Sequence, residues 1–295
     1  MYVKHFGLTR RPFAATTDAP SYYPATAHER ALRLLTEALH EQESFAVLTG
    51  EAGTGKTLVA HRLIERMGDS RQASWLANTH LPDLPAFLQA LLYDLDQPYQ
   101  GLSEQELRLR LTDHLLRQFQ DGRPVLLVID EAHHLTLAML EELRLLGNLE
   151  ARPGKALQVV LVGPPGLLHT LRHTALAGLW QRIGTRVHLP PLDVHEAADY
   201  LLHHLRAAGG RPERLITEEG LEALARGTGG VPRLLNQAAH RAFQLAAEAG
   251  QPCVDAEAAL EALAELELTA ATPPPGEELS EDADAAAGCN LKPAA

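Results

Sequence analysis

The chain has 295 residues, of which 45% are hydrophobic and 5% aromatic, and its formal net charge is −12. This length allows a large domain and a smaller one, with cores built from Leu, Val and Ala. The acidic balance disfavours nucleic-acid binding, which needs Lys and Arg opposite phosphates. The two cysteines cannot form a disulfide framework. The sequence shows no apolar leader, which would indicate secretion. It also shows no run of about 20 apolar residues, which would indicate a transmembrane segment, so a cytoplasmic protein is expected.

Residues 1–27 are expected to be irregular, because prolines interrupt scattered aromatic residues there. Beyond them, short apolar runs alternate with amphipathic helical patterns. The predicted strands are 45–48, 73–77, 125–129, 159–162 and 187–189. The predicted helices around them are 28–40, 58–67, 84–95, 104–120, 137–149 and 167–180. This alternation predicts an α/β fold with a parallel five-stranded sheet flanked by helices.

After residue 192 the pattern changes to helices alone. The predicted helices are 196–208, 217–226, 232–248 and 255–266, and glycine-rich stops separate them. The expected organisation is a sheet-containing domain over 1–192, an all-helical domain over 193–268, and a disordered acidic and Pro-rich tail over 269–295.

A glycine-rich segment lies between the first predicted strand and the helix that follows it. It reads Gly50-Glu51-Ala52-Gly53-Thr54-Gly55-Lys56-Thr57-Leu58, and its first eight residues fit G-x-x-x-x-G-K-[ST] fully. In such a loop the backbone N–H groups turn towards phosphate oxygens, and the helix N-terminus adds its dipole. All nine residues are therefore expected to bind ATP. Lys56 is expected to reach the β- and γ-phosphates, and the Thr57 hydroxyl to ligate Mg²⁺.

Two acidic residues, Asp130 and Glu131, directly follow the apolar run Val125–Ile129. Because the carboxyl ends of parallel strands meet at one edge of a sheet, both carboxylates are expected beside the phosphate loop. Asp130 is expected to hold Mg²⁺, and Glu131 to polarise the water that attacks the γ-phosphate. Together with the loop, this pair predicts an ATPase that uses ATP and Mg²⁺.

Further short segments, spread over about residues 2–266, form a combination that is typical of one protein family. They are Phe6-Gly-Leu, Arg11-Pro-Phe13, Tyr22-Tyr23, His28, 140–146, 157–163, 181–183, 189–192, and Gly230-Val-Pro-Arg233 with Asn236. This combination resembles the general secretion pathway protein A family of ATPases. The resemblance implies an AAA+ core of the origin-recognition type with a helical lid. It also implies a homo-oligomer, with a hexamer as the family expectation.

The resemblance implies roles for three more residues. Arg182 resembles an arginine finger that reaches the γ-phosphate of a neighbouring subunit. Its rival is Arg186, and the alternative for Arg182 is a surface cation at a helix end. Arg233 resembles the lid arginine that contacts phosphate, a task suited to the fixed fork of a guanidinium. Asn78 is left open between a residue that orients Glu131 and an ordinary turn residue.

Some residues depart from the family pattern or leave alternatives open. Pro164 stands where family members carry Gln, so a polar sensor group is missing there. Family members often continue into a membrane helix and a cell-wall-binding domain, which this sequence does not show. Phe6, Phe13 and Tyr22 either cover the adenine or pack the N-terminal segment on the core.

Two histidines that follow one another, His203 and His204, are expected on the surface of a helix, because no metal-ligand spacing accompanies them.

Three functional hypotheses follow. The first is an oligomeric ATPase that remodels or regulates a protein partner in secretion, pilus or envelope biogenesis. The alternative is a DNA-associated AAA+ regulator of the transposition or origin-recognition type. The basic cluster Arg62, Arg66 and Arg71 favours DNA, while the acidic balance opposes it. A switch that binds ATP without turnover is disfavoured by Glu131.

Overall fold

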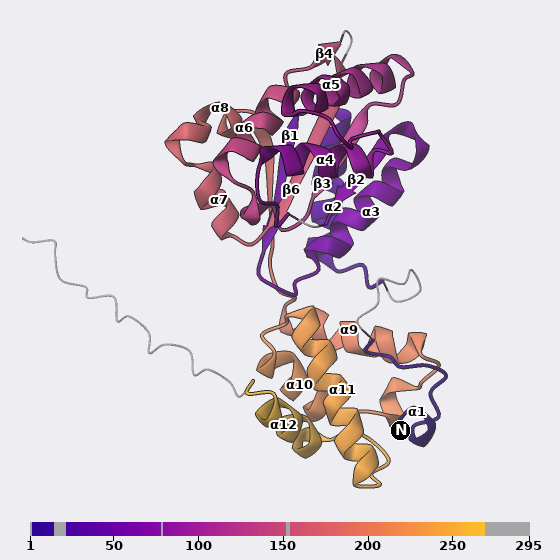
Figure 1. Cartoon of the computed structure of the whole chain (residues 1–295). Helices are drawn as coiled ribbons and strands as arrows, with labels where there is room; N and C mark the ends of the chain where they lie inside the picture. The colour runs from indigo at the N-terminus through magenta and orange to yellow at the C-terminus, as the bar shows by residue number, and fades with distance from the viewer. Residues whose placement is uncertain (1, 15–21, 78, 152–153, 269–295) are drawn as a thin grey trace, which may run out of the picture.

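The computed structural model describes residues 2–14, 22–77, 79–151 and 154–268, and it has two bodies (Figure 1). One body contains the sheet and its flanking helices. The other is helical and lies at one end of the sheet. In the described ranges, every helix falls short of the length and apolar character that a bilayer crossing demands.

Five parallel strands form the sheet in the order β2-β3-β6-β1-β7. Their bounds are β1 Phe45–Gly50, β2 Gln72–Leu76, β3 Val125–Ile129, β6 Leu157–Gly163 and β7 Ile183–Leu189. The three central strands are buried throughout, which explains why their sequences are mostly apolar. The predicted five-stranded parallel sheet is therefore confirmed. All five strands have their carboxyl ends at the edge that faces the helical body (Figure 1).

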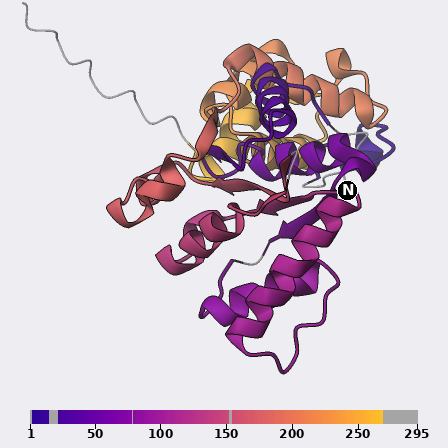
Figure 2. The same ribbon diagram turned by 90° about the horizontal axis from the view of Figure 1, so that it is seen from above.

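Helices cover both faces of the sheet, so that the body has three layers (Figure 2). One face packs against α2 Thr26–His40 and α3 Lys56–Met67. The other packs against α4 Leu84–Asp94, α5 Glu104–Gln120, α6 Leu137–Leu146, α7 Gly166–Leu171 and α8 Ala177–Trp180. Alternate residues of each strand serve the two faces, as the pleat of a strand requires.

The region 137–180 is less regular than predicted. Helix α6 ends at Leu146, and a small hairpin of β4 Glu150–Ala151 and β5 Gly154–Lys155 follows. The predicted helix 167–180 is divided, because the turn Thr174–Leu176 separates α7 from α8. The imidazole of His173 accepts a hydrogen bond from Ala175 N at 3.2 Å, and this capping bond competes with a continuous helix.

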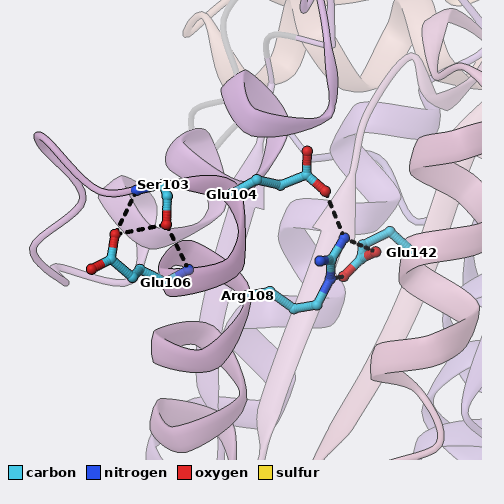
Figure 3. Close-up of polar contacts among 5 residues, drawn as sticks. All are labelled: Ser103, Glu104, Glu106, Arg108 and Glu142. Carbon is cyan, nitrogen blue, oxygen red and sulfur yellow. Dashed lines mark hydrogen bonds and ion pairs between the residues drawn. The ribbon is translucent and has the colours of Figure 1, made fainter.

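Helix α5 shows how local sequence fixes an element (Figure 3). Ser103 caps its N-terminus, and Glu106 accepts a hydrogen bond from Ser103 N at 2.8 Å, which completes a capping box. One turn further on, Arg108 donates to both carboxylate oxygens of Glu142 on α6, at 2.7 and 3.0 Å, and to Glu104 at 3.0 Å. The ion pair fastens α5 to α6 on one face of the sheet.

The helical body consists of α9 Val194–Ala207, α10 Glu218–Gly227, α11 Pro232–Glu248 and α12 Ala256–Glu265. The N-terminal segment also packs here, and it opens with an unpredicted helix, α1 Tyr2–His5. The rings of Phe6 and Phe13 lie 5.1 and 5.6 Å from the ring of Phe243. This aromatic cluster is the physical reason why the segment packs on the helical body and not on the sheet-containing domain over 1–192 expected from the sequence. We propose that residues 2–14 belong to the helical unit.

Candidate functional site

The glycine-rich loop lies at the carboxyl edge of the sheet, between β1 and α3. Gly53 and Gly55 have φ angles of 85° and 98°, which favour glycine. Space demands glycine as well. A Cβ on Gly53 would lie 2.7 Å from the Cβ of Arg233, and one on Gly55 would lie 2.6 Å from His28 Nε2. The loop is therefore clamped between α2 and the start of α11.

His28 provides the clamp on the sheet side. It is 4% exposed, and its Nε2 donates to the carbonyl oxygen of Thr54 at 2.8 Å. Because a carbonyl oxygen only accepts, the proton is at Nε2. Burial lowers the pKa of His28, which keeps the ring neutral. Apart from the place of His28 in the family pattern, no chemical signal in the sequence points to this role.

Lys56 lies inside the loop. Its side chain is largely buried, and Nζ donates to the carbonyl oxygen of Glu51 at 3.0 Å. Burial lowers the pKa of Lys56, while the nearby carboxylates of Glu131, Asp130 and Glu51 act in the opposite direction. The ammonium group is thus held against the backbone of the loop, where a phosphate oxygen could replace the carbonyl.

Thr57 and Asp130 are joined directly. The Thr57 hydroxyl donates to Asp130 Oδ2 at 2.8 Å, and Asp130 Oδ1 accepts from Glu131 N at 2.9 Å. A hydroxyl and a carboxylate are hard oxygen ligands, so this pair fits Mg²⁺. The described residues contain no group of three or more His, Cys, Asp or Glu arranged as a metal site. Phosphate oxygens and water would therefore have to complete the coordination.

Glu131 follows in a left-handed backbone conformation with a φ of 49°. Thr79, from the loop after β2, donates to the carbonyl oxygen of Glu131 at 3.0 Å and so fixes this turn. The side chain of Glu131 is 52% exposed, and Oε2 lies 3.2 Å from His133 Nδ1. Glu131 also lines the cavity beside Lys56. Its carboxylate can therefore act as a proton acceptor next to the phosphate loop.

Arg233 reaches the site from the helical body. Pro232 opens α11, and Arg233 N donates to the carbonyl oxygen of Gly53 at 3.2 Å. The guanidinium lines the same cavity as Lys56 and contributes to the lowering of the Lys56 pKa. A phosphate between the two bodies could therefore contact both cations.

Arg182 is exposed and does not line this cavity. It precedes Ile183, which pairs with Phe45 at the amino end of β1, whereas the loop follows the carboxyl end. At about 3.3 Å per residue the two lie roughly 17 Å apart along the strands. Arg186, the rival, lies 3.8 Å from the centre of the Trp180 ring and donates to the Ile183 carbonyl at 2.9 Å. Neither arginine reaches the site within one subunit.

A cavity of about 700 Å³ lies between the two bodies, with the phosphate loop as one wall. The opposite wall carries the rings Phe13, Tyr23, Tyr200, His204 and His240. Phe13 therefore both lines the cavity and packs the N-terminal segment on the helical body. Phe6 and Tyr22 do not line it, and Tyr22 instead donates to Glu29 at 2.6 Å. An aromatic wall opposite a phosphate loop can hold a flat base.

Two residues of this wall were missed or misjudged. Tyr200 exchanges hydrogen bonds with Asn236 and carried no signal in the sequence. His204 is 5% exposed, so the expectation of a surface histidine is wrong for it, because its side of α9 faces the N-terminal segment. Burial, aided by His203, lowers the pKa of His204 to about 4.

Asn78 and the tail 269–295 lie outside the described residues. Pro164 follows β6, and its carbonyl oxygen accepts from Leu167 N at 3.0 Å, inside the turn that starts α7.

Comparison with known proteins agrees with this geometry. A family model described as "AAA domain" matches residues 39–171. General secretion pathway protein A of Aeromonas hydrophila is 36% identical over 244 residues, which make up 82% of this chain and 44% of that protein. The chain thus spans less than half the length of this relative.

Two solved structures show the same fold. The ORC2 protein of Aeropyrum pernix, in ADPNP–ADP complexes, has a TM-score of 0.67 at 18% identity, covering 88% of this chain and 72% of that one. Cdc6p of Pyrobaculum aerophilum has a TM-score of 0.66 at 22% identity, covering 82% and 67%. Residues 39–171 are therefore similar to an AAA domain, the chain has the fold of origin-recognition AAA+ structures, and it is similar to general secretion pathway protein A over most of its length.

Proposed function

We propose that the chain binds ATP with Mg²⁺ and hydrolyses it to ADP and phosphate. The observation that carries this proposal is the bond of 2.8 Å between Thr57 and Asp130, which joins the phosphate loop to the acidic pair. The nucleotides in the ORC2 complexes of Aeropyrum pernix support the choice of ligand.

Each residue has a task in this proposal. Lys56, the loop N–H groups and Arg233 would bind the phosphates, and the aromatic wall would hold the base. Glu131 would accept the proton of a water whose oxygen attacks the γ-phosphorus, while the bond to the β,γ-bridging oxygen breaks. Mg²⁺, held by Thr57 and Asp130, would neutralise charge on the phosphate oxygens.

Oligomerisation is part of the same proposal. Arg182 lies at the far end of the sheet from its own phosphate loop, so it could act only on the site of a neighbouring subunit. A ring-forming arrangement would place such a guanidinium against the γ-phosphate. A hexamer stays a family expectation.

The partner is proposed from the relative alone. Because that protein is named for general secretion, we propose that ATP turnover remodels or regulates a protein assembly in secretion, pilus or envelope biogenesis. A cytoplasmic location stays a prediction.

The basic cluster that favoured DNA gives little support to that alternative. Arg71 is 7% exposed and donates to Gln158 and to the Leu39 carbonyl oxygen, while Arg62 pairs with Glu65 at 2.7 Å. These arginines therefore do not form one surface that could contact a phosphate backbone.

Phosphate release from purified protein tests the proposal. Wild type should hydrolyse ATP in Mg²⁺, and Glu131→Gln should bind ATP with little turnover, because the amide cannot accept a proton. Glu261→Gln, at an exposed position of α12, is the matched control and should hydrolyse like wild type. Equal turnover by Glu131→Gln and wild type would contradict the assignment of the base.

A further inference from the structure

The carboxylate of Glu131 lies against one particular atom. His133 Nδ1 lies 3.2 Å from Glu131 Oε2, within ion-pair distance. Nδ1 is buried and makes no hydrogen bond within the described part of the chain, so the carboxylate lies near it without being in line. A modest turn of the carboxylate would complete the bond and satisfy a buried nitrogen that is otherwise costly.

The ring of His133 is held in place. Its centroid lies 3.9 Å from that of His134, whose ring in turn contacts His80 at 4.7 Å. The 131–134 segment is a tight turn that begins at Glu131 and is fixed by Thr79. The imidazole, held by these ring contacts, thus lies beside the half-exposed side chain of Glu131.

The chemistry of the pair assigns the proton. A neutral imidazole has one N–H, and the nitrogen beside a carboxylate is the one that carries it. The titratable groups that face His133 are Glu131, Lys56 and His134, and burial comes first among the causes that lower the His133 pKa. A neutral donor therefore faces the carboxylate near neutral pH.

We propose that His133 is a positioning residue for Glu131: its Nδ1–H holds the carboxylate in the orientation from which it accepts the proton of the attacking water. This inference rests on the proposed ATPase function and deepens it. It concerns turnover and not nucleotide binding, because His133 reaches the nucleotide only through Glu131.

Substitution of His133 by Asn or by Gln distinguishes the role of the Nδ1 atom from that of the imidazole ring as a whole. The side-chain nitrogen of Asn lies roughly where Nδ1 of His lies, while that of Gln lies roughly where Nε2 lies. His133→Asn should therefore keep kcat within about threefold of wild type, whereas His133→Gln and His133→Ala should lower it about tenfold. In all three, KM for ATP should stay within about twofold, since only the chemical step is affected.

The matched control is His61→Ala, which removes another half-buried imidazole stacked on a ring, that of Trp75 at 4.1 Å. It should leave kcat and KM unchanged. ATP affinity and melting temperature, measured for every variant, monitor folding.

The steady-state kinetics of these variants decide the matter. Asn and Ala variants with equal kcat, or a loss confined to KM, would overturn the positioning role while the ATPase function stands. An unchanged kcat in His133→Ala would do the same. Absence of turnover in well-folded wild type would overturn the proposed function, and this inference with it.

Discussion

The Thr57 hydroxyl and Asp130 Oδ2 lie 2.8 Å apart although 73 residues separate them in sequence. The bond joins the first turn of α3 to the end of β3, and it brings together two oxygen ligands that Mg²⁺ would use. The distance follows from topology, since β3 and β1 lie on either side of β6 and both end at the same edge.

Removal of this hydroxyl should act through the metal. Thr57→Val, which keeps the shape of the side chain, should lower affinity for ATP about tenfold in Mg²⁺ and much less in EDTA. Calorimetric titration under both conditions measures this difference. Thr57→Ser, which keeps the hydroxyl, is the control and should bind like wild type. An equal loss with and without Mg²⁺ would show that Thr57 has no role towards the metal.

The fit of Gly55 against His28 makes a second prediction. Gly55→Ala adds a Cβ 2.6 Å from His28 Nε2 at a φ of 98°, so it should lower ATP affinity more than tenfold. Gly68→Ala has a φ of 51° with nothing within 4 Å, and it should bind ATP like wild type. Both substitutions also place a side chain at a positive φ, which strains the backbone in each variant. Similar ATP affinities in the two variants would contradict the claim that the close contact of Gly55 with His28 shapes the loop for ATP.

Arg108 should matter for stability more than an exposed arginine on the same helix (Figure 3). Arg108→Ala leaves the carboxylate of Glu142, which is 4% exposed, without its partner and should cost about 2–3 kcal/mol of unfolding free energy. Arg117→Ala removes a pair with Asp113 whose side chains are 71% and 58% exposed, and should cost under about 0.5 kcal/mol. Urea unfolding measures both. Equal losses of unfolding free energy would mean that the pair of Arg108 with Glu142 stabilises the fold no more than an exposed pair does.

Much of this fold follows from the sequence because its signals are local. The central strands are mostly apolar runs, and α5 begins at its capping box, so both were predicted within a residue or two. The phosphate loop and the acidic pair carry their chemistry in adjacent residues. The two lie close together because both follow the carboxyl ends of parallel strands in one sheet.

The missed features depend on contacts that are distant in the sequence. The N-terminal aromatic residues gave no indication that they would find Phe243, more than two hundred residues away. For the same reason the burial of His204 and the place of Tyr200 in the cavity wall were not foreseen. Helical patterns show that one face of α9 is apolar, but they do not show what covers the remaining faces.

His204 should make stability depend on pH. Its pKa falls from 6.5 to about 4 on folding, because burial disfavours the charged ring. Between these values the unfolded chain binds more protons, so stability should rise with pH by up to about 1.4 kcal/mol per unit and fall on acidification from about 6.5 to about 4.

Urea unfolding at pH 7.5 and 5 checks this dependence. His204→Gln should reduce it, while His195→Gln, at an exposed position of α9, is the matched control. An unchanged pH dependence in His204→Gln would contradict the assignment.

A shared site predicts complementation between inactive subunits. Arg182→Ala should bind ATP yet turn it over at least tenfold more slowly, and Lys56→Ala should not bind ATP. Mixed together, they should regain activity, because the intact Arg182 of one subunit can serve the intact loop of the other. Arg186→Ala, whose guanidinium lies over Trp180, is the control. Full activity of Arg182→Ala alone would contradict the role of Arg182 as an arginine finger.

Calorimetric titration of the folded chain with ATP in Mg²⁺ tests the central claim most directly. Wild type should bind one ATP per subunit, Glu131→Gln should bind as well, and Lys56→Ala should bind none. Wild-type protein that is well folded but gives no heat of binding would contradict the account.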